Sequence, residues 1–288
     1  MTMRHPFTPV LIIGAPRSGT NMLRDILTQF DGVATWPCDE INYIWRHGNL
    51  RYPSDELPAS LATESVQRYI RRQFEWVARR YDASIVVEKT TANSLRVPFV
   101  DSVVPDARYV FIRRDGLDAV GSAIKRWKAP LDIPYLAQKA RLVPPADLPY
   151  YAIRYLGSHV YRLMSREKRV AFWGPRLAGM DELLANHPLD EICALQWQRC
   201  VEQSVEAFDH MDPSRWIEVG YESFVTHPDE QLRRILTFAG IEASADQVAA
   251  AVAGVRADSV GKGCASLSDE AAERLRDLVG PMLKRLGY

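Results

Sequence analysis

Residues 10–23 carry the pattern most informative about chemistry, VLIIGAPRSGTNML. An apolar run ends in a glycine-rich turn, and an amphipathic helical pattern follows at once. This is the layout of a strand, a phosphate-binding loop and a helix. The backbone N–H groups of such a turn and the N-terminus of the helix together can bind an anion. The sequence therefore predicts an anion site at residues 14–20.

This loop departs from the one that binds nucleoside triphosphates. Gly14 and Gly19 have the spacing of G-x-x-x-x-G-K-[ST], but Thr20 and Asn21 stand where the lysine and the Ser/Thr should be. The lysine that reaches the β- and γ-phosphates is missing, and so is the usual magnesium-binding hydroxyl. Arg17 supplies positive charge from inside the loop. We expect a phosphate loop with a task other than ATP hydrolysis.

A second motif follows a later strand pattern, RRDGLDAVGS at residues 113–122. The strand delivers Arg114 to the edge of a sheet, and Ser122 lies eight residues further on, in the next helix. A guanidinium and a hydroxyl placed in this way can bind one phosphate, the arginine in bidentate fashion. An Arg–Asp pair that caps the helix, with an ordinary helical serine, explains the same residues equally well.

Strand patterns alternate with helical patterns along the chain, which predicts an α/β fold: a mostly parallel sheet with helices on both faces. Strands are predicted at residues 7–13, 84–88, 107–112 and 216–219. Helices are predicted at residues 19–30, 61–80, 96–103, 117–127, 150–165, 189–208, 229–239 and 268–286. Ligands of such sheets lie beyond the carboxyl ends of the strands. Those ends carry polar residues here, at 14–19, 88–91, 113–115 and 220–222.

Length and composition fit a single globular domain over residues 1–288. Hydrophobic residues make up 47% of the chain, and 36 basic residues balance 36 acidic ones, so neither nucleic acid nor an anionic membrane is indicated as a partner. The four cysteines have neither C-x-x-C spacing nor a zinc-ligand pattern. Because no apolar run reaches transmembrane length and no signal-peptide pattern precedes the first strand, we expect a cytoplasmic protein.

The two motifs together resemble those of the sulfotransferases that use 3′-phosphoadenosine 5′-phosphosulfate (PAPS). Further segments resemble this family in the same order along the chain: EKTTAN at 88–93, VPDAR at 104–108, FWGP at 172–175, YESF at 221–224 and PMLKRLGY at 281–288. The last segment is similar to the tail of the tyrosylprotein sulfotransferase catalytic domain. Arg17 replaces the loop lysine of the cytosolic hormone and phenol enzymes, which favours the bacterial, carbohydrate and tyrosylprotein branches.

The resemblance implies a role for each matching residue in binding the donor. Five loop residues would hold the 5′-phosphosulfate: Arg17, Ser18, Gly19, Thr20 and Asn21. Arg114 and Ser122 would hold the 3′-phosphate, and Tyr221 would lie near the nucleotide. Lys262 resembles the basic residue of a late loop that closes over the 3′-phosphate, although a plain surface lysine fits the segment VGKG equally well.

Sulfuryl transfer would also need a base for the acceptor hydroxyl and positive charge near the sulfuryl group. The cytosolic members use a histidine after the second strand, where this chain has EKT. The tyrosylprotein branch uses a glutamate downstream of the loop arginine, and Glu40 lies 23 residues after Arg17. We expect Glu40 to be the base, with Asp39 and His47 as the alternatives. Lys89 would stabilise the bridging oxygen or the sulfuryl group together with Arg17, and no metal is implied.

The acceptor is expected to be a small alcohol, a phenol, a tyrosyl side chain or a glycan. Residues 31–58 are expected to be an irregular, aromatic-rich segment, of the kind that forms lids or pocket walls. Several aromatic side chains are candidates either for stacking on the acceptor or for the core: Tyr43, Trp45, Tyr135, Tyr150, Tyr151 and Trp173. The rival interpretations are a P-loop-type kinase and a nucleotide-binding module without catalysis. Both a monomer and a homodimer are compatible with the sequence.

Overall fold

The computed structural model describes residues 6–129, 143–153 and 173–288. Five strands, all parallel to their neighbours, form one sheet in the order β2-β3-β1-β4-β5. The strands are β1 (Thr8–Ile13), β2 (Val33–Ala34), β3 (Ile85–Lys89), β4 (Arg108–Arg113) and β5 (Trp216–Gly220). Four of them match the predicted strands to within one residue at each end. β2 falls in the segment expected to be irregular, because a strand of two residues carries no periodic pattern.

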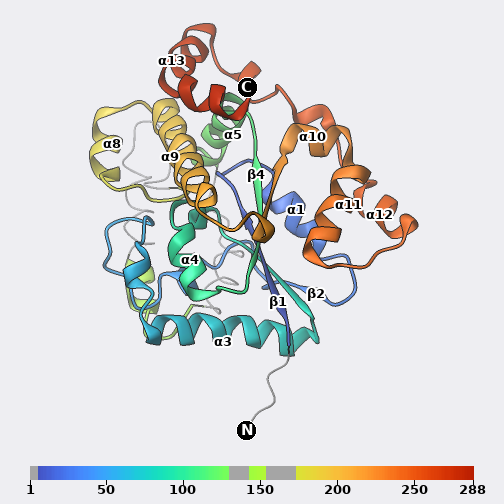
Figure 1. Ribbon diagram of the computed structural model, residues 1–288. Helices are drawn as coiled ribbons and strands as arrows, with labels where there is room; N and C mark the ends of the chain where they lie inside the picture. The colour runs from blue at the N-terminus through green and yellow to red at the C-terminus, as the bar shows by residue number, and fades with distance from the viewer. Residues whose placement is uncertain (1–5, 130–142, 154–172) are drawn as a thin grey trace.

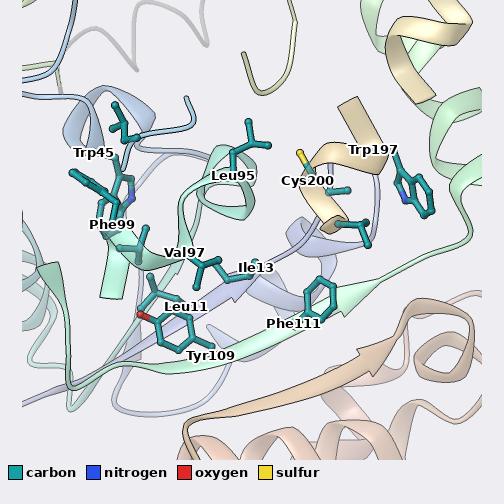
Figure 2. Close-up of a cluster of buried hydrophobic side chains, with 14 of the residues drawn as sticks. Leu11, Ile13, Trp45, Leu95, Val97, Phe99, Tyr109, Phe111, Trp197 and Cys200 are labelled. Atoms are coloured by element: carbon teal, nitrogen blue, oxygen red, sulfur yellow. The ribbon is translucent and has the colours of Figure 1, made fainter. Parts of the chain in front are cut away.

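Side chains alternate between the two faces of the sheet, and both faces are buried. Leu11 and Ile13 of β1 belong to one core cluster, whereas Val10 and Ile12 belong to the other. Figure 2 shows the first cluster, in which Leu11 and Ile13 lie with Tyr109 of β4. This double burial explains why the strands are nearly continuous apolar runs, and it confirms the α/β prediction.

Helices cover both faces of the sheet (Figure 1). One face carries α1 (Thr20–Leu27), α10 (Tyr221–Thr226), α11 (Pro228–Ala239) and α12 (Ala245–Val252). The other carries α3 (Glu64–Tyr81), α4 (Val97–Val103), α5 (Gly116–Trp127), α8 (Met180–Asn186), α9 (Leu189–Asp209) and α13 (Asp269–Leu286). Among the described residues, no helix is long and apolar enough to cross a membrane.

The predicted helices are present where the structure describes them, and local signals mark several of their ends. The Ser268 hydroxyl accepts the N–H of Ala271 at the start of α13, and Ser244 and Gln247 form a reciprocal cap on α12. Four helices were not expected, namely α2 (Asn42–Trp45), α8, α10 and α12. Residues 148–153 are helical, and the rest of the helix predicted at 150–165 lies outside the described residues. A single domain over 1–288 stays a prediction.

The connections reverse direction across the sheet at β1, which makes the end of β1 a topological switch point. After β1 the chain passes to β2 and β3 on one side, then crosses to β4 and β5 on the other. The helix after β1 covers one face, whereas those after β3 and β4 cover the opposite face. Loops that diverge in this way leave a ligand-binding crevice at the carboxyl ends of the strands. Ile12 pairs with Lys89 and Ile13 with Phe111, so residues that follow β1, β3 and β4 meet at this edge.

Candidate functional site

The loop between β1 and α1 has a backbone that only glycine accepts at two positions. A Cβ atom on Gly14 would lie 2.5 Å from the carbonyl oxygen of Ile112 in β4. Gly19 has φ +88°, and a Cβ there would lie 2.5 Å from the ring of Tyr221. Arg17 is also left-handed, with φ +70°, which is uncommon for a residue with a side chain. Strained backbone of this kind clusters at ligand-binding sites.

Ser18 in the same loop is fully buried, and its Oγ has no hydrogen-bond partner among the described residues. An unpaired buried hydroxyl costs roughly 1–3 kcal/mol of stability. A phosphate or sulfate oxygen seated in the loop would supply the missing partner. The buried Nε of Arg114 is unpartnered in the same way. The residues present therefore fit an anionic ligand.

Arg114 connects the loop to two other segments. Its Nη1 donates to the backbone carbonyl of Arg17 at 3.0 Å, and its Nη2 donates to the carbonyl of Ser259 at 2.9 Å. Its guanidinium lies 4.3 Å from the centre of the Tyr221 ring, and the Tyr221 hydroxyl lies 2.5 Å from Ser259 Oγ. The structure thus brings Arg114 and Tyr221 together beside the loop, as expected for one binding site.

The two sequence motifs meet through a side-chain contact. Arg17 Nε donates to Ser122 Oγ at 2.9 Å, across 105 residues of sequence. Burial lowers the pKa of Arg17, and the positive charges of Arg126 and Arg114 lower it further. Three cationic side chains gathered in this way form a strong site for an anion. Arg126 was not among the expected residues, although its position one helical turn after Ser122 was a usable signal.

Lys262 is held in a segment that folds against α5. The Asp118 carboxylate accepts the N–H of Gly261 at 2.6 Å and that of Cys264 at 2.9 Å. The side chain of Lys262 is exposed and pairs with Asp258 at 2.7 Å. Arg114 reaches the same segment through the carbonyl of Ser259. The segment therefore lies beside the predicted phosphate ligands, while the role of Lys262 stays a prediction.

Glu40 and Lys89 form the second half of the site. Glu40 Oε1 accepts from Lys89 Nζ at 2.9 Å, from Thr91 Oγ1 at 2.9 Å and from the backbone N–H of Thr91 at 3.3 Å. The Lys89 side chain is 2% exposed, whereas that of Glu40 is 28% exposed. The carboxylate is therefore held at the end of β3 and is still reachable from solvent.

The two alternative bases are engaged elsewhere. Asp39 Oδ1 accepts from Arg24 Nη1 at 3.2 Å. His47 Nδ1 lies 2.8 Å from Asp147 Oδ2, and its ring lies 3.9 Å from that of Tyr69. Of the three candidates, Glu40 is the one whose carboxylate meets Lys89.

A buried carboxylate, Glu88, lies next to Lys89 in β3. Burial raises the pKa of Glu88 to about 7, although the hydrogen bond from Thr90 and the charges of Lys89 and Arg96 oppose the shift. Thr90 Oγ1 donates to Glu88 Oε1 at 2.6 Å, and Asn93 Nδ2 donates to Oε2 at 2.9 Å. Glu88 thus anchors the chain that follows β3.

The aromatic candidates for the acceptor wall differ in how deeply they are buried. Tyr43 and Trp45 are 4% and 0% exposed and belong to the core, so the structure favours the core alternative for these two. Figure 2 shows Trp45 beside Phe99 in the buried cluster. The half-buried ones that the structure describes are Tyr150, Tyr151 and Trp173. Tyr135 and Phe172 lie outside the described residues.

Comparison with known proteins identifies the family. A model of the sulfotransferase family matches residues 9–140 and 151–245. The chain belongs to this family. Protein-tyrosine sulfotransferase A of Caenorhabditis elegans is 27% identical to this sulfotransferase over 118 residues, a match that covers 33% of this chain and 30% of that protein. The match therefore spans less than a third of the length of this curated relative.

Solved structures of sulfotransferases share the fold. STF9 from Mycobacterium avium has a TM-score of 0.54 at 15% identity, over 97% of this chain and 76% of that one. The sulfotransferase domain of the Synechococcus PCC 7002 olefin synthase has a TM-score of 0.54 at 12% identity, over 97% of both chains. A sulfotransferase from Alicyclobacillus acidocaldarius reaches 0.50 at 17% identity, over 97% of this chain and 94% of that one. The family and fold predicted from the motifs are confirmed.

Proposed function

We propose that this sulfotransferase moves the sulfuryl group of PAPS to an acceptor hydroxyl by in-line displacement. The observation that carries the proposal is the meeting of two groups of residues at one edge of the sheet. Arg17, Ser122 and Arg114 form a cationic cluster after β1 and β4. Glu40 and Lys89 form an acid–cation pair after β3. The first group suits an anionic donor, and the second suits proton removal beside a developing negative charge.

The donor would be held by its two anionic ends. The loop N–H groups, the Ser18 hydroxyl and Arg17 would bind the 5′-phosphosulfate, with Thr20 and Asn21 at the N-terminus of α1 adding its dipole. Arg114, Ser122 and Arg126 would bind the 3′-phosphate. Tyr221, already packed on Arg114, would lie against the nucleotide. Lys262 would add charge from the segment that Asp118 holds.

The chemical step would use the second group of residues. Glu40 would take the proton of the acceptor hydroxyl as its oxygen attacks the sulfur atom. Lys89 would stabilise the charge that develops on the bridging oxygen when the sulfur–oxygen bond to the donor's 5′-phosphate breaks. Arg17 would stabilise the sulfuryl oxygens. By analogy with phosphoryl transfer, positioning and cationic stabilisation would supply most of the rate enhancement. The cations needed are protein side chains, so we propose no metal.

Calorimetric titration tests the donor. The purified protein is titrated with 3′-phosphoadenosine 5′-phosphate and, separately, with ATP and magnesium. Tight binding of the bisphosphate with little binding of ATP is expected, because the loop lacks the lysine and the magnesium hydroxyl of a nucleoside-triphosphate site. Preference for ATP would overturn the proposal in favour of a P-loop-type kinase.

Transfer itself is tested with sulfur-labelled PAPS and a panel of acceptors: a small alcohol, a phenol, a tyrosyl peptide and a glycan. Label on one of these classes identifies the acceptor. Binding of the bisphosphate without transfer to any of them, and without release of labelled sulfate, would favour a nucleotide-binding module without catalysis.

A further inference from the structure

Glu40 stands in a stretch without regular structure, between β2 and α2. A general base in such a stretch must be held from outside the stretch. We propose that Arg24 and Thr90 are positioning residues for Glu40, one fixing the main chain just before it and the other the main chain just after it. This inference rests on the proposed function, in which Glu40 takes the acceptor proton.

Arg24 holds the residue that precedes Glu40. Its Nη1 donates to the backbone carbonyl of Asp39 at 3.1 Å and to Oδ1 of the same residue at 3.2 Å. Its Nε and Nη2 donate to Asp25 Oδ1 at 2.9 and 2.6 Å, which fixes the guanidinium on α1. Burial disfavours the charge of Arg24, yet the hydrogen bonds and charges of Asp25 and Asp39 together raise its pKa. Because α1 also begins at the phosphate loop, Arg24 fixes the position of Glu40 relative to that loop.

Thr90 holds the residue that follows Glu40. The backbone N–H of Ile41 donates to Thr90 Oγ1 at 3.1 Å, across 49 residues of sequence. A threonine hydroxyl has one proton, and Thr90 gives it to Glu88 at 2.6 Å. The lone pairs of the hydroxyl are thereby oriented toward Ile41. Thr90 is 0% exposed and Glu88 is 1% exposed, so no water competes for either bond.

The two contacts act on the main chain, whereas Lys89 and Thr91 act on the carboxylate itself. The carboxylate can meet Lys89 and Thr91 from several backbone positions, but only a backbone fixed on both sides keeps the distance to the acceptor constant. A misplacement of about 1 Å in such a site can cost about a hundredfold in rate. Arg24 and Thr90 therefore control the rate without touching the substrate.

The experiment compares Thr90→Val, Thr90→Ser and Arg24→Gln with the parent in the full chain. We expect kcat to fall about ten- to a hundredfold in Thr90→Val and Arg24→Gln, with the Kd of 3′-phosphoadenosine 5′-phosphate within about twofold of the parent. Thr90→Ser keeps the hydroxyl and should restore most of the rate. Tyr109→Phe is the matched control, because it removes a buried hydroxyl that donates to Asp101 at the opposite end of the sheet. It should leave kcat unchanged.

The decisive comparison repeats Thr90→Val and Arg24→Gln in a Glu40→Gln background. If both residues act through Glu40, neither should lower kcat further once the base is gone. A loss of equal size in both backgrounds would show general destabilisation and would overturn the proposal. A parent-like kcat in the single variants would overturn it too.

Amide hydrogen exchange on the same variants gives a readout that needs no activity. Exchange at residues 39–42 should speed up by about tenfold or more in Thr90→Val and Arg24→Gln, and stay as in the parent in Tyr109→Phe. Unchanged exchange at 39–42 would overturn the positioning role. A parent that transfers no sulfuryl group would refute the proposed function, and the exchange data would still decide whether these two residues hold the segment.

Discussion

The proposed donor half and the proposed acceptor half of the site are built in different ways. The donor half is centred on a short loop, residues 14–19, whose shape comes from Gly14, Gly19 and the strand and helix at its ends, and Arg114 and Ser122 join it from the β4–α5 segment. The acceptor half is a carboxylate in an irregular segment, joined to Lys89 and Thr91 by contacts that span 49 and 51 residues of sequence. The loop of the donor half thus takes its shape from local backbone geometry, whereas its arginines and the proposed base are placed by tertiary contacts.

The largest expected effect separates the two halves by function. Glu40→Gln should slow transfer by about two to four orders of magnitude, the usual effect of losing a general base, and leave the affinity for 3′-phosphoadenosine 5′-phosphate unchanged. Steady-state kinetics and calorimetry measure the two quantities. Asp31→Asn, which changes an exposed carboxylate of the same segment, serves as the control and should leave both the turnover and the affinity unchanged. Unchanged turnover in Glu40→Gln would show that another residue is the base.

The second effect concerns the pH dependence of the acceptor half. Burial raises the pKa of Glu88 to about 7 from an ordinary value of 4.5, so the fold favours the neutral acid. This contribution to the free energy of unfolding is fully present below pH 4.5 and is lost as pH rises to about 7, a change of about 3 kcal/mol. Urea unfolding between pH 4.5 and 8 measures it, and Glu88→Gln should remove this dependence. Equal pH profiles for parent and variant would contradict the assignment.

The third expected effect is a loss of ligand affinity in the donor half. Arg114→Ala should weaken binding of 3′-phosphoadenosine 5′-phosphate by about 2–3 kcal/mol, because a charged contact from a buried guanidinium with an unpartnered Nε would be lost. Calorimetry gives the change in affinity. Arg108→Ala is the control, because Arg108 begins the strand that Arg114 follows and its side chain donates only to the carbonyl of Phe238 among the contacts described. An affinity for Arg114→Ala within about twofold of the parent would argue against the contact.

The smallest expected effect concerns an exposed arginine at the periphery of the donor half. Arg126 is exposed on α5, so Arg126→Ala should weaken binding of the bisphosphate by only about 0.5–1 kcal/mol. The loss should diminish at high salt, because screening acts on exposed charges. Lys125→Ala, at the neighbouring exposed position, controls for net charge. Equal effects of the two variants would mean that Arg126 contributes general charge and no specific contact.

Much of the donor half could be predicted from the sequence, because its residues fall into two short sequence motifs. Arg17, Ser18 and Gly19 follow a buried strand directly, and Arg114 and Ser122 belong to one strand–helix motif. The structure adds that Arg17 reaches Ser122, a contact that no local pattern contains. Arg126 was overlooked because a basic residue on an exposed helix face resembles any other.

The acceptor half was harder to predict. Glu40 was identified through resemblance to a family, and its contact with Lys89 is consistent with that choice. The aromatic residues near it left core and site open as alternatives, and Tyr43 and Trp45 belong to the core, where Trp45 packs edge-on against Phe74. Hydrophobicity alone does not distinguish an aromatic side chain that packs in a core from one that stacks on a ligand.

By itself the sequence determined four of the five strands and the helices with a clear periodic pattern, the glycines that the loop backbone demands and the family to which the chain belongs. These features are local, since a buried strand is an apolar run and a phosphate loop is a few consecutive residues. Only the tertiary structure decided which groups meet: Arg24 with Asp39, the Thr90 hydroxyl with the backbone N–H of Ile41, and Lys89 with Glu40. Contacts of this kind depend on how the sheet brings distant segments to one edge. The spacing of two residues along the chain does not predict how close their side chains lie in space.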